Sequence, residues 1–141
     1  MEALEISRLS VSGGNAIKYF ENRVQAGFPS PAQGNYGDIL DLNRELINHP
    51  AATFCARVIG KSMIDAGINE GDLLIIDRSL TPRDGSIAVC FVDGDFTVKR
   101  LSVREDGLYM TPANESFPEI KVSPESNFVV WGVVSYIVKK V

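Results

Sequence analysis

The sequence predicts a mostly β protein: a compact, barrel-like β-sheet body preceded by a flexible and weakly helical N-terminal arm. From about residue 52 onward, short runs rich in β-branched and aromatic residues are separated by Gly, Asp and Pro, which is typical of an all-β body. Before that point such runs are few and helix or strand breakers are frequent. We therefore expect an arm over residues 1–50 and a body over residues 51–141.

Two short helices are expected in the arm. In the first, over residues 16–24, Ile17, Phe20 and Val24 fall on one face at helical spacing. The second covers residues 40–48 and is ended by the His49-Pro50 pair. Because isolated helices of this length are marginal in water, neither is expected to be stable by itself.

Seven strands are expected in the body, and turn-forming residues such as Asp93-Gly94 separate them. Gly132 interrupts the last and longest apolar run, which predicts a bulge or bend there. The expected strands cover residues 53–59, 72–77, 86–92, 96–103, 108–111, 119–122 and 128–138.

Composition limits the classes of function. The chain has 141 residues, a net charge of −4 and a pI near 5.0, which suits one globular domain and disfavours direct, sequence-specific DNA binding. Cys55 and Cys90 are isolated, and His49 is the single histidine. This pattern predicts core cysteines in a reducing compartment, with no metal site, no disulfide framework and no cofactor. No apolar stretch has the length of a signal peptide or membrane span, so we expect a cytoplasmic chain without membrane contact.

Ser62 is the first candidate for chemistry. It lies in Gly60-Lys61-Ser62-Met63, directly after a β-like run. A serine hydroxyl becomes a nucleophile when a neutral lysine amine lies close enough to take its proton. The alternative is structural: Ser62 can also be the N-cap of a short helix over residues 62–66, and taken alone the pattern favours this alternative.

Lys99 is the candidate base, because strand alternation places it on one side with apolar Leu101 and Val103. Burial disfavours an ammonium group and lowers the pKa of a lysine by up to about 3–5 units, which suits a general base. The alternatives are that Lys99 protects an edge strand or extends to water. Ala26-Gly27, in a loop-like stretch of the arm, is the candidate bond for cleavage.

The sequence resembles the UmuD-type SOS mutagenesis proteins, members of the LexA-like family (S24) of self-cleaving serine peptidases. The motifs occur in the order and spacing of that family and extend to Trp131-Gly132-Val133-Val134. The others are Ala26-Gly27-Phe28-Pro29-Ser30-Pro31-Ala32, Asp41-Leu42-Asn43, His49-Pro50, Gly60-Lys61-Ser62-Met63-Ile64-Asp65, Gly71-Asp72-Leu73-Leu74-Ile75 and Asp93-Gly94-Asp95-Phe96-Thr97-Val98-Lys99.

The resemblance implies a function and a set of roles. Ser62 is the nucleophile, Lys99 the general base, and the backbone N–H groups of Lys61 and Ser62 the oxyanion hole. The bond between Ala26 and Gly27, in the chain's own arm, is the substrate. The family further implies activation by a RecA filament on single-stranded DNA, after which the shortened form dimerises and joins a UmuC-type Y-family translesion polymerase.

Three other classes of protein share parts of this pattern. A non-catalytic regulatory module of a polymerase complex needs neither a reactive serine nor a lysine base. A phage-type repressor needs a DNA-binding domain, which the 26 residues before the candidate bond are too few to form. A signal-peptidase-like enzyme also uses serine and lysine, but with a membrane anchor.

Overall fold

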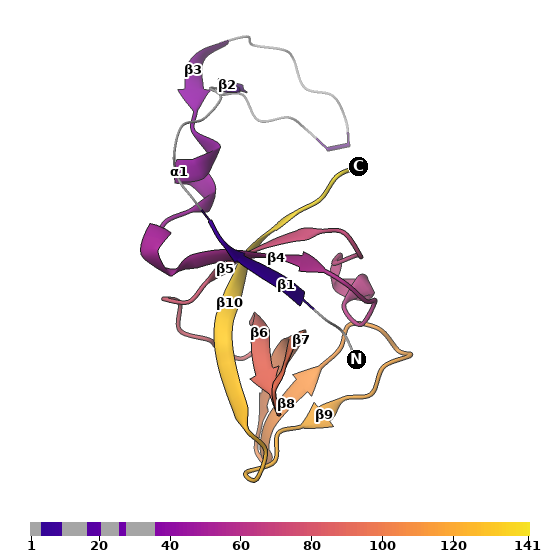
Figure 1. Ribbon diagram of the computed structural model, residues 1–141. Coiled ribbons are helices and arrows are strands. Elements are labelled where there is room, and N and C mark those ends of the chain that lie inside the picture. Colours follow the sequence, from indigo (N-terminus) through magenta and orange to yellow (C-terminus); the bar gives the residue numbers. More distant parts are fainter. Residues whose placement is uncertain (1–3, 10–16, 21–25, 28–35) are drawn as a thin grey trace. The chain divides into compact units, whose positions relative to one another are not determined.

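The computed structural model describes residues 4–9, 17–20, 26–27 and 36–141 (Figure 1). The chain forms two compact units, one of residues 1–10 with 49–141 and one of residues 11–48. We call the first the body and the second the arm unit. The predicted mostly β fold class is confirmed, since strands make up most of the regular structure.

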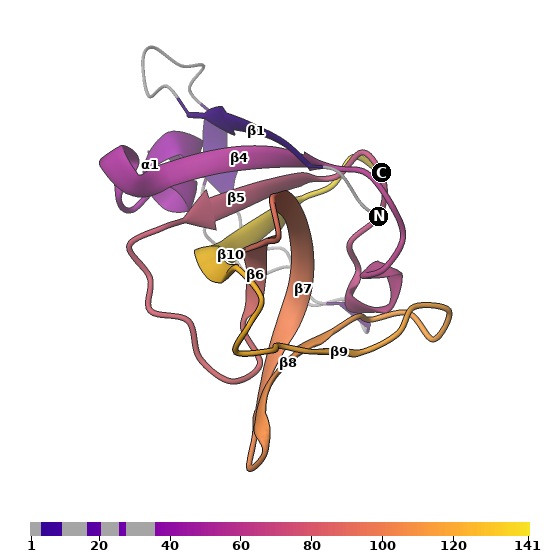
Figure 2. The same cartoon turned by 60° about the horizontal axis from the view of Figure 1, so that its bottom comes forward.

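The body contains an eight-stranded sheet in the order β1-β4-β5-β10-β6-β7-β8-β9, in which every neighbouring pair is antiparallel (Figures 1 and 2). All seven strands predicted for the body are present, as β4 to β10. The strands are β1 (Leu4–Arg8), β4 (Thr53–Val58), β5 (Leu73–Asp77), β6 (Ile87–Val92), β7 (Asp95–Arg104), β8 (Gly107–Thr111), β9 (Ile120–Lys121) and β10 (Phe128–Val138). Two 3-10 turns, η1 (Pro50–Ala52) and η2 (Ile64–Ala66), flank β4 along the chain.

Strand β10 joins the two halves of this sheet. Its first half pairs with β6 and its second half with β5, so that Val133 lies opposite both Ala88 and Asp77. The register shifts between Val130 and Gly132, which confirms the predicted bulge at this glycine. In Figure 1 β10 is the long curved strand that runs from the β6–β9 end of the sheet to β5.

The arm unit differs from the prediction. The helix predicted over residues 16–24 is wrong where the structure describes it, because residues 17–20 form strand β2 (Ile17–Phe20), which pairs with β3 (Tyr36–Leu40). Ile, Tyr and Phe suit a strand as well as a helix, and a pairing partner decides between the two. The second predicted helix is confirmed in shorter form as α1 (Leu42–Leu46), where the Asp41 side chain accepts a bond from Asn43 N.

The first strand was also not expected. Residues 4–8, which the sequence assigns to the arm, form β1 and pair along their whole length with β4 of the body. Leu-Glu-Ile-Ser-Arg alternates apolar and polar residues with a period of two, which favours a strand beside an available edge. The flexibility of an arm over residues 1–50 stays a prediction.

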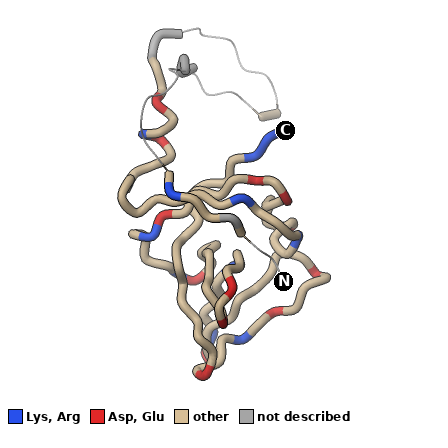
Figure 3. The backbone as a smooth tube through the Cα atoms, in the orientation of Figure 1, with Lys and Arg blue, Asp and Glu red and all other residues tan. Residues whose placement is uncertain are grey.

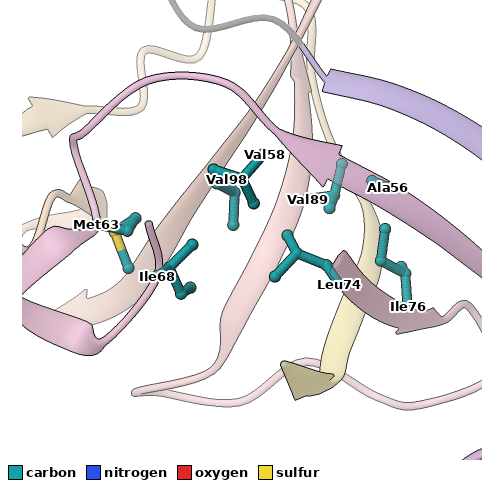
Figure 4. Packing of buried hydrophobic residues seen from close by; sticks show 8 residues of the cluster. All are labelled: Ala56, Val58, Met63, Ile68, Leu74, Ile76, Val89 and Val98. Carbon is teal, nitrogen blue, oxygen red and sulfur yellow. The ribbon is translucent and has the colours of Figure 1, made fainter. Parts of the chain in front are cut away.

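Two groups of buried apolar side chains form the core of the body. The larger cluster, drawn in Figure 4, comprises Ala56, Val58, Met63, Ile68, Leu74, Ile76, Val89 and Val98. The smaller comprises Ala88, Cys90, Leu101 and Met110. Because neighbouring residues of β6 and β7 belong to different clusters, this part of the sheet is covered on both faces.

Charged residues of both signs are scattered along the described part of the chain (Figure 3). None of the helices among the described residues is sufficiently long and apolar to span a bilayer.

Candidate active site

The fold brings Ser62 and Lys99 together. Ser62 lies in the connection after β4, and Lys99 lies in the middle of β7, 37 positions later. The Lys99 Nζ and the Ser62 Oγ are 2.8 Å apart, and the two residues are 7% and 0% exposed. A serine hydroxyl and a lysine amine are thus in hydrogen-bond contact, shielded from bulk water, which is the geometry that proton transfer between them requires.

The structural alternatives for both residues are wrong. The 3-10 turn η2 begins after Met63 and has no side-chain cap, so Ser62 does not act as its N-cap. Lys99 protects no edge, because β7 lies between β6 and β8. Its amine is held inside the body and does not extend to water.

The Lys99 amine has two further partners. It lies 2.8 Å from Thr97 Oγ1 and 3.2 Å from the Val98 carbonyl oxygen. A neutral amine has two N–H donors and one lone pair. In the structure the Lys99 Nζ donates to Ser62 Oγ, to Thr97 Oγ1 and to the Val98 carbonyl. Once the amine is neutral, bonds from its two N–H groups to Thr97 and Val98 would direct the lone pair to the Ser62 hydroxyl proton. Thr97 therefore orients the amine. The sequence carried a signal for this role, since Thr97 lies two residues before Lys99 on the same face of the strand.

Long-range hydrogen bonds hold the backbone on either side of Ser62. The Gly60 N–H donates to a Glu70 carboxylate oxygen at 3.0 Å, and the Asn114 side-chain amide donates to the Lys61 carbonyl at 2.8 Å. Ile64 N also donates to the Lys61 carbonyl, at 3.2 Å. The two bonds to the Lys61 carbonyl hold the peptide group that carries the Ser62 N–H, which the family resemblance assigns to the oxyanion hole together with the Lys61 N–H. Glu70 and Asn114 were missed because no local pattern connects them to Ser62.

A cavity of about 400 Å³ extends from Lys99 along the body. Thr97 and Lys99 lie in its wall, together with the apolar side chains of Val92, Met110, Phe117 and Ile120. Asp93 and Asp95 also line this cavity, whereas Ser62, which is 0% exposed, does not. A mainly apolar cavity that reaches the lysine of the pair can accommodate a peptide segment beside it.

The thiol of Cys90 also lies in the surroundings of Lys99. Burial raises the pKa of Cys90 to about 12, against the opposing effect of the nearby Lys99 charge. Cys90 is thus a protonated, unreactive core residue at neutral pH. Cys55, the second free cysteine, is half-buried.

His49 and Asp77 form a separate polar pair at the start of β4 and the end of β5. The His49 Nδ1 and the Asp77 Oδ2 are 2.6 Å apart, and Ser79 donates to the other carboxylate oxygen through its N–H and its hydroxyl. Burial acts to raise the pKa of Asp77, but the bonds from Ser79 and His49 prevail, and the pKa lies below its ordinary value. This pair is structural, since it shares no contact with Ser62 or Lys99 among the bonds described above.

Asp72, at the start of β5, is the second buried carboxylate with a lowered pKa. Burial acts to raise it, while the Asn69 N–H and the Lys139 ammonium lower it by more. The bond from the Asn69 N–H shows that the Asp72 side chain stabilises the turn before β5. Within the described residues, His, Cys, Asp and Glu form no group of three or more that could hold a metal ion.

The candidate cleavage bond belongs to the arm unit. Ala26 and Gly27 lie in the connection between β2 and β3, and both are exposed. The rest of the motif that contains them, residues 28–32, is outside the described residues.

A buried serine hydroxyl in hydrogen-bond contact with a lysine amine, in an antiparallel β body, is an arrangement compatible with a serine peptidase that uses a lysine base. Comparison with known proteins identifies a peptidase family. Residues 18–135 match the model of the Peptidase S24-like family. The chain belongs to this family.

Individual relatives extend this result. The chain is 44% identical to Protein MucA of Salmonella typhimurium over 123 residues, which cover 86% of this chain and 84% of the relative. It is 43% identical to Protein ImpA of Shigella flexneri over 121 residues, with 86% and 82% covered. The LexA repressor of Stenotrophomonas maltophilia is 35% identical over 111 residues, which cover 79% of this chain and 52% of that protein.

Proposed function

We propose that the chain is a self-cleaving serine peptidase of the SOS response to DNA damage, which cuts its own Ala26–Gly27 bond with Ser62 as nucleophile and Lys99 as general base. The observation that carries the proposal is the 2.8 Å contact between the Lys99 Nζ and the Ser62 Oγ in a buried site. Membership of the S24-like peptidase family supports the reaction class. The chemistry is a switch that each chain uses at most once.

The first half of the reaction forms an acyl-enzyme. The neutral Lys99 amine takes the Ser62 hydroxyl proton while Oγ attacks the Ala26 carbonyl carbon. The backbone N–H groups of Lys61 and Ser62 then stabilise the tetrahedral oxyanion, a contribution of about 3–4 kcal/mol per donor in other serine peptidases. The carbon–nitrogen bond breaks as the Lys99 ammonium returns the proton to the Gly27 amine. Water, deprotonated by the same lysine, releases Ala26 from Ser62.

The substrate segment fits the cleft in size and polarity. On the acyl side of the bond, the apolar Val24 and the small Ala26 suit a cavity lined by Val92, Met110, Phe117 and Ile120, while the polar Gln25 lies between them in the sequence. Gly27 on the leaving side adds no side chain that would have to pass the nucleophile.

The burial of Ser62 implies that self-cleavage needs a conformational change. A nucleophile that is 0% exposed cannot meet a scissile carbonyl without a rearrangement. A partner that binds the rearranged state more tightly raises its population. We assign this role to a RecA filament on single-stranded DNA.

Further proposals concern the organisation and partners of the chain. The flexible arm spans residues 1–50 and the peptidase domain spans residues 51–141. The chain is cytoplasmic, and its shortened product acts as a homodimer with a UmuC-type Y-family translesion polymerase.

An activation experiment at neutral pH tests the proposal. Purified protein is incubated with RecA, single-stranded DNA and a nucleoside triphosphate, and products are identified by intact mass. We expect fragments 1–26 and 27–141 from the wild type, and no cleavage in Ser62→Ala or Lys99→Met. Equal cleavage without DNA would contradict the role of the filament. Equal cleavage in the Ser62→Ala variant would contradict the catalytic assignment and leave the chain as a non-catalytic binding module.

A further inference from the structure

Strand β1 covers an edge of the body's sheet. It is the outermost strand, and its five residues pair antiparallel with β4, from Leu4 opposite Val58 to Arg8 opposite Phe54 (Figure 2). Without β1, the backbone N–H and C=O groups of β4 on that side would lack their strand partner. An edge of this kind is a template for another strand.

The side chains of β1 also cover part of the core. Leu4 and Ile6 are half-buried and pack against the larger cluster, and they lie opposite its members Val58 and Ala56. Between these two positions, Glu5 pairs in register with Arg57, an exposed residue whose guanidinium donates to the Gly71 carbonyl at 2.9 Å. The β4 edge therefore selects an extended segment with the pattern apolar–acidic–apolar, which in this chain is Leu4-Glu5-Ile6.

The cut proposed above separates β1 from the body's sequence, and the present inference rests on that proposed cleavage. Residues 1–26 carry both β1 and β2, whereas their partners β4 and β3 stay with the product. Two-stranded pairing such as β2–β3 is marginal by itself. Residues 9–52 tether β1 to β4, and a tether of this length gives an effective concentration on the order of 0.1 mM. A strand that binds with a Kd of about 0.01 mM is then about 90% seated before the cut and mostly lost from micromolar protein afterwards.

We propose that the outer edge of β4 is a strand-addition site, which β1 occupies until cleavage and which then takes an extended apolar–acidic–apolar segment of a partner protein, antiparallel to β4. A second copy of this chain, paired through its own β4, suits the edge less well. The sequence of β4, Thr-Phe-Cys-Ala-Arg-Val, has no acidic residue to place opposite Arg57. A partner segment with the pattern of β1 has one.

The first test needs no self-cleavage. In a full-length Ser62→Ala chain, the double substitution Leu4→Asp and Ile6→Asp weakens the chain's own β1 and frees the edge. The probe is a fluorescent peptide of residues 1–10, followed by anisotropy. We expect it to bind the freed-edge variant at least about tenfold more tightly than Ser62→Ala alone, whose own β1 competes. A peptide with the same two Asp substitutions is the matched control and does not bind.

A charge control tests the pattern. A probe peptide with Glu5→Lys is expected to bind the freed-edge variant about two- to fivefold more weakly, and Arg57→Glu in the protein is expected to reverse that preference. If the double substitution prevents folding, as judged by circular dichroism, the milder Ile6→Ser variant gives the same order of affinities with a smaller difference.

A second test follows the strand after cleavage. Ser7 lies directly opposite the free Cys55, so Ser7→Cys places two thiols at a separation that a disulfide can bridge. In the self-cleaved Ser7→Cys protein, the oxidised form is expected to retain residues 1–26 and exclude the probe, and the reduced form to lose them and bind it. The Ser7→Ala protein is the control, and it should bind the probe in both conditions.

The outcomes separate the two proposals. If no chain cleaves itself, the proposed function fails, while the freed-edge experiment still tests the β4 site. The β4 site is contradicted if the folded freed-edge variant binds no probe, if it binds the control peptide equally well, or if it dimerises through β4 and thereby excludes the probe.

Discussion

The substitution Thr97→Val probes how the base is oriented. In the wild type the Thr97 hydroxyl lies 2.8 Å from the Lys99 Nζ and accepts one of its N–H groups. Valine has nearly the same shape but no acceptor, so the amine loses this bond and keeps its contacts with Ser62 at 2.8 Å and the Val98 carbonyl at 3.2 Å. The lone pair is then no longer directed to the serine proton.

The size of the effect follows from the charge that develops on the amine. Lys99 becomes an ammonium in the transition state, and a hydrogen bond to a charged group contributes about 1.5–3 kcal/mol. Since about 1.4 kcal/mol corresponds to a factor of ten in rate, self-cleavage by Thr97→Val should be slower by about 10- to 150-fold. The rate is measured from the loss of intact chain by mass spectrometry, at one pH and with no activator.

Thr97→Ser is the matched control, because it keeps the hydroxyl and removes only a methyl group. It should cleave within about threefold of the wild-type rate, since removal of a half-exposed methyl group disturbs packing little. The orientation argument is refuted if Thr97→Val cleaves as fast as the wild type, or if Thr97→Ser and Thr97→Val are slowed equally.

Three further predictions concern the surroundings of the site. Asn114→Ala removes the 2.8 Å bond to the Lys61 carbonyl and should slow self-cleavage about 5- to 10-fold. Its Tm should be unchanged, so cleavage rates are measured at the same pH as for the wild type and thermal melts are recorded for both proteins. Gly132→Ala places a Cβ 2.6 Å from the buried Ile76 side chain, so urea titration should give a free energy of unfolding lower by about 1–3 kcal/mol; an unchanged midpoint would contradict the close approach. Asp77→Asn removes a carboxylate whose pKa lies below its ordinary value of 3.8. The ionised carboxylate therefore stabilises the folded state above pH 3.8, and this stabilisation is lost as the pH falls through the lowered pKa. The wild type should be more stable than Asp77→Asn by about 1–3 kcal/mol at pH 7. In melts at successively lower pH, this difference should shrink as the pH falls through the lowered pKa of Asp77.

Local sequence patterns predict most strands of the body. Turn residues and short β-branched runs defined each strand from β4 to β10, because these signals are contained within a few neighbouring residues. Alternation along β7 placed Lys99 on the side of Leu101, and the structure buries both. The β bulge at Gly132 followed from a glycine within a long apolar run.

What the sequence could not supply depends on contacts between distant residues. Strand β1 is a five-residue segment whose alternation has meaning only beside the β4 edge, and β2 needed β3 to favour a strand over a helix. Glu70 and Asn114 reach the Ser62 loop from 10 and 53 positions away. The pairing of Ser62 with Lys99 was expected from family resemblance, whereas strand alternation alone predicted only the burial of the lysine.

Self-cleavage of the purified chain without any partner is the most direct measurement. Held at about pH 10, where more of the lysine amine is neutral, the wild type should slowly give a fragment that begins at Gly27, identified by intact mass. The Ser62→Ala chain under the same conditions should remain whole. An unchanged wild-type mass after long incubation, or the same fragment from Ser62→Ala, would contradict the assignment of Ser62 and Lys99.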